Sequence, residues 1–377
     1  MTAARAACEA NGPRTVVFRL SGTITAKSRI TVLKPYLTIA GQTAPGDGIC
    51  LRGAELMIRT HDVIVRYIRF RRGNQSGGDS INIMGGSSNV ILDHCSISWG
   101  QDENGSFYGN NGVTVQWCMI GEGLFPHSCG GLWGSNSSYH HNLIYSNGTR
   151  NPKFSYNHEG EVIDFRNNVI YNWGYQSTIS TGKEGQINIV NNYFRYGPGR
   201  DPDDPLNSQI AEAMDGVRIF ANGNYVWGFS DVTPDNRQGM RGDFVRADQP
   251  FPTVPVTTQT AEKAYEVVLA QAGASVPRRD SADLRVIEQV RSRTSTFAGT
   301  KRGRQYPGIP DSMEQLGGWP ELNSLPAPVD SDHDGMPDAW EAARGLDPND
   351  PADRNGYTLN QDYTNLEHYI NSLILIN

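Results

Sequence analysis

The sequence predicts an all-β protein, a parallel β-helix, that ends in a partly helical C-terminal extension. Within residues 30–230, short strand-like phrases recur with a period of about 24 residues, and each alternates polar and apolar positions before an Asn, Gly or Ser. No 3.6-residue periodicity separates these phrases, so crossover helices are not expected between the strands. Stacking like strands in parallel is then the arrangement that buries a continuous core.

The repeat can be followed along one position. Counted from Asp93, equivalent positions follow in steps of 24, 24, 26 and 24 residues, at Trp117, His141, Asn167 and Asn191. The longer last step, to Asn222, leaves room for a loop over residues 198–205. An antiparallel sandwich would space its strands by about 8–12 residues, so the long, even period disfavours that alternative.

Small polar residues and cysteines recur at matching places in the repeat. Asn142, Asn168 and Asn192 predict a ladder of stacked side-chain amides at a turn. Cys95 and Cys118 are expected on neighbouring coils. The five cysteines show neither a CxxC pair nor zinc spacing, which indicates small buried residues.

The sequence divides into three predicted regions. Residues 1–245 form the β-helix, residues 246–329 a linker and helical extension packed on it, and residues 330–377 a calcium-binding loop with a C-terminal helix. Helical spacing over residues 261–272 ends at Gly273, and Asp280 begins a second helix as its cap. Residues 361–373 are a third helix candidate, and residues 250–255 are predicted to be extended.

Charge and composition limit the partners. A net charge of −7 argues against nucleic acid, and no apolar stretch approaches the roughly 18 residues that span a membrane. Met1 to Arg5 lack the apolar core of a signal peptide, so secretion or a cell-surface or periplasmic location is inferred from the rest of the chain. A monomer is expected.

Residues 330–341, DSDHDGMPDAWE, are the sharpest local motif. Side-chain oxygens recur with the spacing of a calcium loop, Gly335 stands where the loop bends, and Met336 offers its backbone carbonyl. The predicted ligands are Asp330, Asp332, Asp334, Met336, Asp338 and Glu341. Pro337 favours a rigid structural Ca²⁺ site over a calcium sensor.

The stretch over residues 15–224 resembles the pectate lyases of polysaccharide lyase family 1. The phrases that carry the resemblance are NVILDH (89–94), VTVQW (113–117), YHHN (139–142) and RNP (150–152), in that order and spacing. The resemblance implies a right-handed parallel β-helix and β-elimination across the glycosidic bonds of polygalacturonate, an acidic plant cell-wall polysaccharide. It also implies that Arg150, which opens the Arg-x-Pro phrase, is the base.

The chain departs from the family pattern at two basic positions. Ser155 stands where a second Arg is common, and Lys153 is close enough to share its role. A family Lys expected shortly before the YHHN phrase is missing, and His127 or Lys183 could replace it. His127, Lys153 and Lys183 are therefore predicted to bind substrate.

Three acidic residues and several tryptophans complete the predicted site. Asp79 matches a family calcium-ligand position, and Asp102 and Glu103 follow about one coil later, so these three are expected to bind Ca²⁺ beside the substrate. Trp133 is predicted as a sugar platform, as Trp99 and Trp173 could also be, with core filling as the alternative for each.

The function predicted is a secreted, calcium-assisted pectate lyase. A lyase for methylated pectin or another uronic polymer, and a polygalacturonase-type hydrolase on the same fold, remain open. A carbohydrate-binding β-helix without activity is the third alternative; it would not need Arg150 beside acidic residues.

Overall fold

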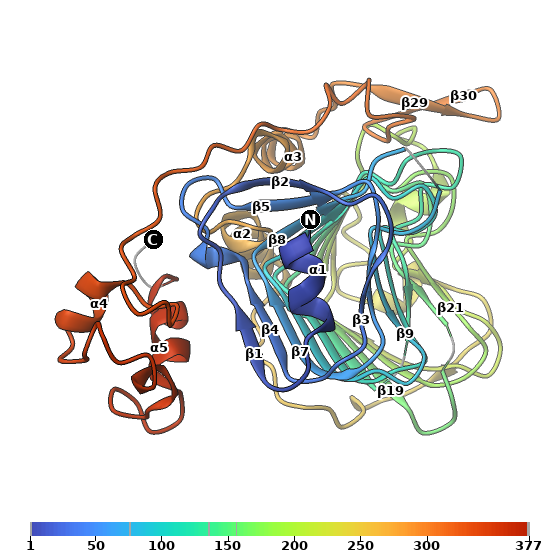
Figure 1. Cartoon of the computed structure of the whole chain (residues 1–377). Coiled ribbons are helices and arrows are strands. Elements are labelled where there is room, and N and C mark those ends of the chain that lie inside the picture. The colour runs from blue at the N-terminus through green and yellow to red at the C-terminus, as the bar shows by residue number, and fades with distance from the viewer. Residues whose placement is uncertain (1, 75–76, 135, 156, 375–377) are drawn as a thin grey trace.

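The computed structural model describes residues 2–74, 77–134, 136–155 and 157–374. It is a right-handed parallel β-helix, in which three long parallel sheets run the length of the molecule and successive coils add one strand to each (Figure 1). Within the described residues, no helix is both long and apolar enough to cross a membrane.

The strands of the three sheets are given in spatial order. Sheet A consists of β1 (Arg14–Val16), β4 (Leu37–Ala40), β7 (His61–Arg66), β10 (Ser88–Asp93), β13 (Asn111–Gln116), β16 (Ser137–His140), β19 (Val162–Arg166), β22 (Gln186–Val190), β25 (Arg218–Asn222) and β28 (Val245–Arg246). Sheet B consists of β2 (Gly22–Thr25), β5 (Ile49–Arg52), β8 (Ile68–Arg71), β11 (Ser96–Ser98), β14 (Met119–Gly121), β17 (Leu143–Tyr145), β20 (Val169–Tyr171), β23 (Tyr193–Arg195) and β26 (Tyr225–Val226). Sheet C consists of β3 (Ile30–Val32), β6 (Leu56–Ile58), β9 (Ile81–Met84), β12 (Gly105–Tyr108), β15 (Leu132–Trp133), β18 (Lys153–Phe154), β21 (Ile179–Thr181), β24 (Ala211–Glu212) and β27 (Met240–Arg241).

The core lies inside the coil and follows from the alternation of each strand. In β10, Val90 and Leu92 point inward, and they pair in register with Val113 and Val115 of β13. All four are at most 1% exposed. Because the same alternation repeats coil after coil, the inward side chains form one continuous apolar cluster.

Strand pairing confirms the repeat but corrects its register by one residue. Asp93 pairs with Gln116, so His94, and not Asp93, is equivalent to Trp117. Asn222 at the far end is likewise displaced by one position. The cause is that the polar positions flanking each turn look alike in sequence, so the pattern sets the period but not the phase.

The predicted asparagine ladder is present and longer than predicted. Each buried amide donates to the next along the chain and accepts from the one before, at 2.9–3.0 Å between Nδ2 and Oδ1, through Asn142, Asn168, Asn192, Asn224 and Asn236. Cys95 and Cys118 do lie on neighbouring coils, where the backbone N–H of Cys95 donates to Cys118 Sγ at 3.4 Å. All five cysteines are buried and unbridged.

The predicted helices of the extension are confirmed. Helix α2 (Ala261–Gln271) is capped by Thr260, and α3 (Ser281–Ser292) by Asp280. Their apolar faces, including Val268 and Val290, pack on outward side chains of sheet B such as Tyr145. A hairpin of β29 (Ala298–Lys301) and β30 (Arg304–Pro307), which the sequence analysis did not predict, then crosses the top of the molecule in Figure 1.

Both ends of the chain cover the first coils. Helix α1 (Thr2–Glu9), also not predicted, lies over the open N-terminal end and adds Cys8 to the core (Figure 1). The C-terminal segment, with α4 (Asp338–Ala342) and α5 (Asn365–Ser372), lies beside β1 and β4. Met336 packs on Ala40 there.

Candidate active site

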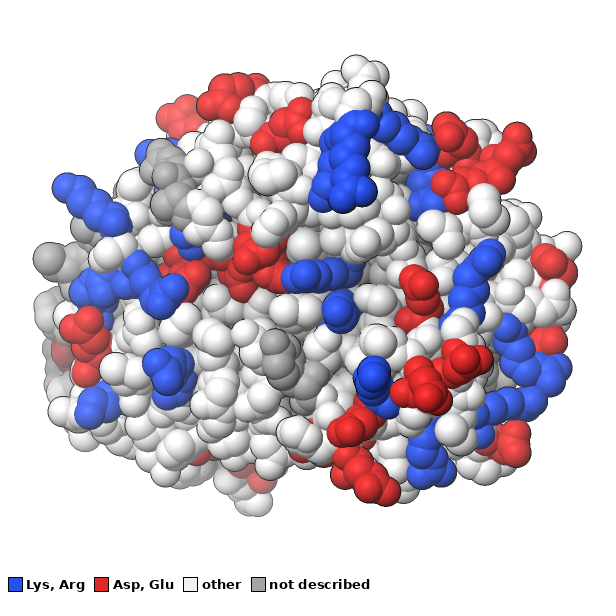
Figure 2. Space-filling model, turned by 90° about the vertical axis from the view of Figure 1, so that its right-hand side faces the viewer, with Lys and Arg blue, Asp and Glu red and all other residues white. Residues whose placement is uncertain are grey.

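Most of the charged residues predicted for the substrate site lie along one corner of the β-helix, where the chain leaves sheet B and enters sheet C. This charged corner comprises residues 79, 102–103, 127–129 and 149–150, on four successive coils. Parallel bridges from Glu103 to Cys129 and from Cys129 to Thr149 align the turns. The coils are about 4.8 Å apart. The space-filling view of this side shows acidic side chains near its middle with Lys or Arg beside them (Figure 2).

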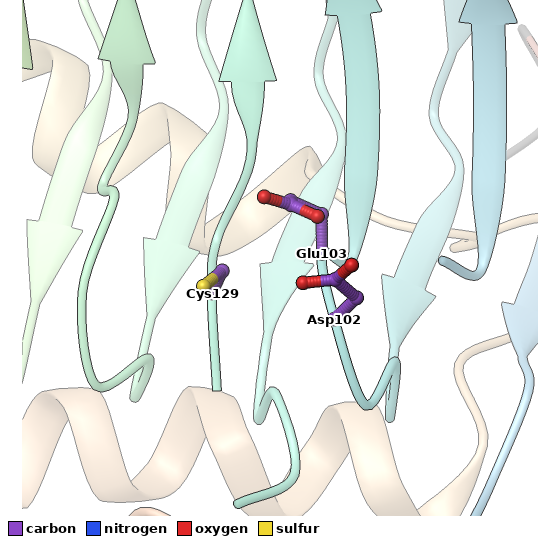
Figure 3. A group of neighbouring side chains, drawn as sticks. All are labelled: Asp102, Glu103 and Cys129. Atoms are coloured by element: carbon purple, nitrogen blue, oxygen red, sulfur yellow. The ribbon is translucent and has the colours of Figure 1, made fainter. Parts of the chain in front are cut away.

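Asp102 and Glu103 lie side by side on the turn before β12. Their carboxylate oxygens and Cys129 Sγ all lie within 4.8 Å of one another (Figure 3). Glu103 is 4% exposed, whereas the Asp102 side chain is 47% exposed. The pair thus offers one carboxylate fixed by the fold and one open to solvent.

Asp79 lies one coil earlier and contacts the same turn. Its Oδ1 accepts a hydrogen bond from the Glu103 backbone N–H at 3.0 Å. Burial, reinforced by the Asp102 carboxylate, raises the pKa of Asp79 to about 6, although hydrogen bonds from Ser106 and Asn82 oppose the shift. A cation beside Asp79 would favour its ionised form.

Arg150 lies two coils after Glu103, and its guanidinium forms an ion pair with the Glu103 carboxylate. Its backbone is left-handed, with φ at 56°, which is uncommon for a residue with a Cβ. The side chain is 33% exposed, so it can reach a polymer lying along the charged corner. The fold therefore joins the predicted base to a predicted calcium ligand.

The donor set at the charged corner fits a hard divalent cation. Carboxylate oxygens of Asp79, Asp102 and Glu103 are the ligands that calcium prefers. Cys129 is not such a ligand, because burial raises the pKa of its thiol to about 12 and keeps it protonated. The roles of the three acids as calcium ligands stay predictions.

His127 and Lys153 lie near Arg150 on the outside. The His127 ring Nδ1 is 2.8 Å from Asp102 Oδ1, and the His127 side chain is 63% exposed. Lys153 follows Arg150 by three residues and is partly exposed on β18, between Leu132 and Ser180 of the neighbouring strands. Both positions are compatible with the predicted substrate contacts.

Two predicted substrate contacts are not brought to the charged corner. Trp133 is 0% exposed and stacks on Tyr139 inside the coil, so its prediction as a sugar platform is wrong. Trp99 and Trp173 are equally buried. Lys183 is exposed, but it follows β21 at the end of sheet C opposite to Arg150, so it does not reach the base.

The structure adds two residues that the sequence analysis missed. Tyr175 donates from its hydroxyl to the His127 carbonyl at 2.9 Å. Lys301, on the hairpin of the extension, donates to the Tyr175 hydroxyl at 2.7 Å. Lys301 lies far from these partners in sequence and no motif surrounds it, so no sequence signal pointed to it.

The C-terminal loop forms a second acidic group. Ligand oxygens of Asp330, Asp332 and Asp334 lie within 4.8 Å of one another, as do those of Asp334, Glu341 and Asp353. Burial raises the pKa of Asp334 to about 6 and that of Glu341 to about 7, with neighbouring carboxylates adding to both shifts. The carboxylates of such a group repel one another unless a cation or protons neutralise them.

Two residues of the loop stand apart from the expected ligand set. The Asp338 oxygens accept hydrogen bonds from Ser331 N and Oγ, both at 2.7 Å, and Asp338 joins neither acidic group, so its role as a ligand stays a prediction. Asp353 was missed, since it lies beyond the twelve-residue motif. Met336 is fully buried, and its backbone carbonyl stays a predicted ligand.

The fold and the charged corner define a parallel β-helix protein with a row of acidic and basic side chains on one outer edge. No protein-family model matches the chain. Probable pectate lyase C of Aspergillus flavus is 37% identical over 383 residues, which cover 96% of this chain and 84% of that protein. Probable pectate lyase C of Aspergillus terreus is 36% identical over 388 residues, with the same coverage.

The chain therefore belongs to the pectate lyase family. Among solved structures, a pectate lyase described in terms of substrate specificity and an anti β-elimination mechanism has a TM-score of 0.50 at 17% identity. The match covers 66% of this chain and 69% of that one. At this identity the likeness supports the fold alone.

Proposed function

We propose that this protein is a pectate lyase that cleaves polygalacturonate by calcium-assisted β-elimination. The observation that carries the proposal is the contact between Arg150 and Glu103, which joins a candidate base to a cluster of candidate calcium ligands. Membership of the pectate lyase family supports the choice of substrate.

The chemistry explains why such a site needs both signs of charge. β-Elimination removes the proton on C5 of a galacturonate ring, forms a C4–C5 double bond and releases the oxygen on C4 as the leaving group. C5 carries a carboxylate, so negative charge develops next to an anion. Cationic groups aligned with that carboxylate offset the added charge.

Arg150 is proposed as the base that takes the C5 proton. A guanidinium is ordinarily protonated, so it can serve as a base only where other cations crowd it or the pH is alkaline. Lys153 and His127 are the neighbouring basic side chains that would also hold substrate carboxylates. Glu103 orients the guanidinium through its ion pair.

Calcium is proposed to bind at Asp79, Asp102 and Glu103, where it would neutralise the substrate carboxylate next to C5. Binding would favour the ionised form of Asp79, whose burial raises its pKa. Because Glu103 also pairs with Arg150, the same carboxylate would couple the metal site to the base.

The test is the ultraviolet absorbance of unsaturated uronide products during incubation with polygalacturonate. A rise with calcium that chelator abolishes is the expected result. No rise on polygalacturonate, but a rise on methylated pectin or another uronic polymer, would show that the reaction is β-elimination and that the substrate is that other polymer. New reducing ends without absorbance would overturn β-elimination.

Hydrolysis of the same polymer is the second candidate, and one observation favours it. A hydrolase needs a protonated carboxyl group beside an ionised one, and Asp79, with its pKa raised to about 6, stands next to Asp102. Against it, Asp79 is only 8% exposed and its carboxylate already binds the Glu103 backbone.

A second, structural calcium ion is proposed in the C-terminal loop. Buried oxygens of Asp332, Asp334, Glu341 and Asp353 accept no hydrogen bond from the described residues. Orphaned buried carboxylate oxygens suit a hard cation that needs six to eight oxygen ligands. Calcium is plentiful outside cells, so we propose that the protein is secreted. We also propose that it acts as a monomer.

A further inference from the structure

The hairpin of β29 and β30 docks on the charged corner. Its strand β29 ends at Lys301, and the hairpin lies at the upper right of Figure 1. The Lys301 ammonium donates to the Pro126 carbonyl at 2.6 Å, next to His127 in the chain. It also donates to the Tyr175 hydroxyl at 2.7 Å and lies 3.9 Å from the centre of that ring.

These contacts place a positive charge beside a coil of the β-helix that has few basic residues of its own. The coil between the carboxylate turn and Arg150 contains no Lys or Arg over residues 121–135. Its only basic side chain is His127, which faces Asp102. Lys301 therefore brings a cation to that coil from outside the repeat.

The ammonium is held but not neutralised. An ammonium group has three hydrogens to donate, and two are used by Pro126 and Tyr175. Among the ion pairs of the described residues, none within 4.0 Å involves Lys301. Burial lowers its pKa, which is consistent with a charge that lacks a carboxylate partner. The side chain stays partly exposed, so one donor can face a ligand.

We propose that Lys301 binds a carboxylate of the anionic polysaccharide, as a substrate-binding residue supplied by the C-terminal extension. A polyuronide lying along the charged corner carries one carboxylate on each ring, and it crosses the coil of His127 between the acids and Arg150. Lys301 meets it there. This inference rests on the proposed function, because it assumes an anionic polymer in the site.

The test compares Lys301→Met with Lys301→Arg and with Arg304→Gln as the matched control. Arg304 lies opposite Lys301 on the same hairpin but pairs with Asp201, so its loss perturbs the hairpin without removing the hydrogen bonds of Lys301. Two quantities are measured: KM and kcat on polygalacturonate, and the Kd for polygalacturonate in an Arg150→Ala background, which needs no turnover. Thermal unfolding of each variant reports stability.

Lys301→Met is expected to raise KM and Kd about tenfold or more, with kcat and the unfolding temperature little changed, because one charge-assisted hydrogen bond is lost. Lys301→Arg should restore most of the affinity, and Arg304→Gln should match the wild type. Unchanged KM and Kd in Lys301→Met would overturn the inference. An equal loss of affinity in Arg304→Gln would also overturn it, because Lys301 would then serve only to hold the hairpin on the β-helix. A protein that binds polygalacturonate through Lys301 but does not cleave it would refute the proposed function alone.

Discussion

Arg150 is the residue on which the proposed chemistry depends most. Arg150→Ala should lower kcat by about 10² to 10⁴, the usual contribution of a general base. Because the Arg150 side chain is partly exposed and pairs with Glu103, its loss should change the free energy of unfolding far less than a core substitution. Kinetics on polygalacturonate and thermal unfolding measure the two effects. An Arg150→Ala enzyme with wild-type kcat would remove Arg150 as the base.

His140 should set part of the pH dependence of stability. Burial lowers its pKa to about 3, and the charges of His141 and Arg166 act in the same direction, while Asp93 opposes them. Since the folded pKa lies below the ordinary value of 6.5, the stabilisation is complete above pH 6.5 and is lost as the pH falls toward 3. The loss is about 1 kcal/mol per pH unit for a group this buried.

The measurement is the free energy of unfolding between pH 7 and pH 4.5 for the wild type, His140→Asn and His158→Asn. The His140 variant should show a shallower decline than the wild type. His158 is exposed, so its variant should follow the wild-type profile. Parallel profiles for all three proteins would rule out the assigned role of His140.

At the scale of elements, the asparagine ladder should be a main source of coil-to-coil stability. Asn192 Oδ1 accepts from the backbone N–H and the side chain of Asn168, and its Nδ2 donates to Asn224. Asn192→Ala leaves buried donors without partners, which should cost about 2–4 kcal/mol. Asn222→Ala, at an exposed position outside the ladder, should cost less than about 0.5 kcal/mol in the same denaturant titration.

In the C-terminal loop, the effect of Glu341→Gln on the free energy of unfolding should depend on whether calcium is present. Without calcium at pH 8, Glu341→Gln should be at least as stable as the wild type, because a buried carboxylate with a pKa raised to about 7 is ionised there at a cost. With calcium at a hundredfold excess over Kd, the wild type should gain about 2.7 kcal/mol and Glu341→Gln much less.

Asp353→Asn tests the ligand that the motif did not contain, and Asp338→Asn is its control. Asp353 belongs to the acidic group of Glu341, whereas the Asp338 oxygens bind Ser331. Calcium titrations followed by thermal unfolding should show a reduced gain for Asp353→Asn and a wild-type gain for Asp338→Asn. The reverse ranking would restore the ligand set expected from the sequence.

For the whole molecule, the sequence was most informative where the same physical requirement repeats. Each coil must bury the same inward positions and form the same turn, so the spacing of residues such as Val90, Val113 and Asn168 predicted the β-helix. The helices of the extension were predictable for a local reason, since Thr260 and Asp280 act as caps within their own segments.

The features that the sequence did not predict depend on tertiary contacts, which the spacing of residues does not reveal. Strand β15 has only two residues, too few for alternation to show that Trp133 points inward while Leu132 points outward. Lys301 reaches the charged corner only because the extension folds back over the coils, a tertiary contact between segments far apart in sequence. Of the candidate site, the order of Asp79, Glu103 and Arg150 along one corner followed from the repeat, but their contacts did not.

The most direct test of the central claim is cleavage of polygalacturonate with the products analysed by mass spectrometry. β-Elimination adds no water, so the account predicts one unsaturated ring per cleavage, in a product lighter by one water than its saturated counterpart, formed only when calcium is present. Saturated products alone, with one water gained per cleavage, would contradict it, since only hydrolysis adds water across the glycosidic bond.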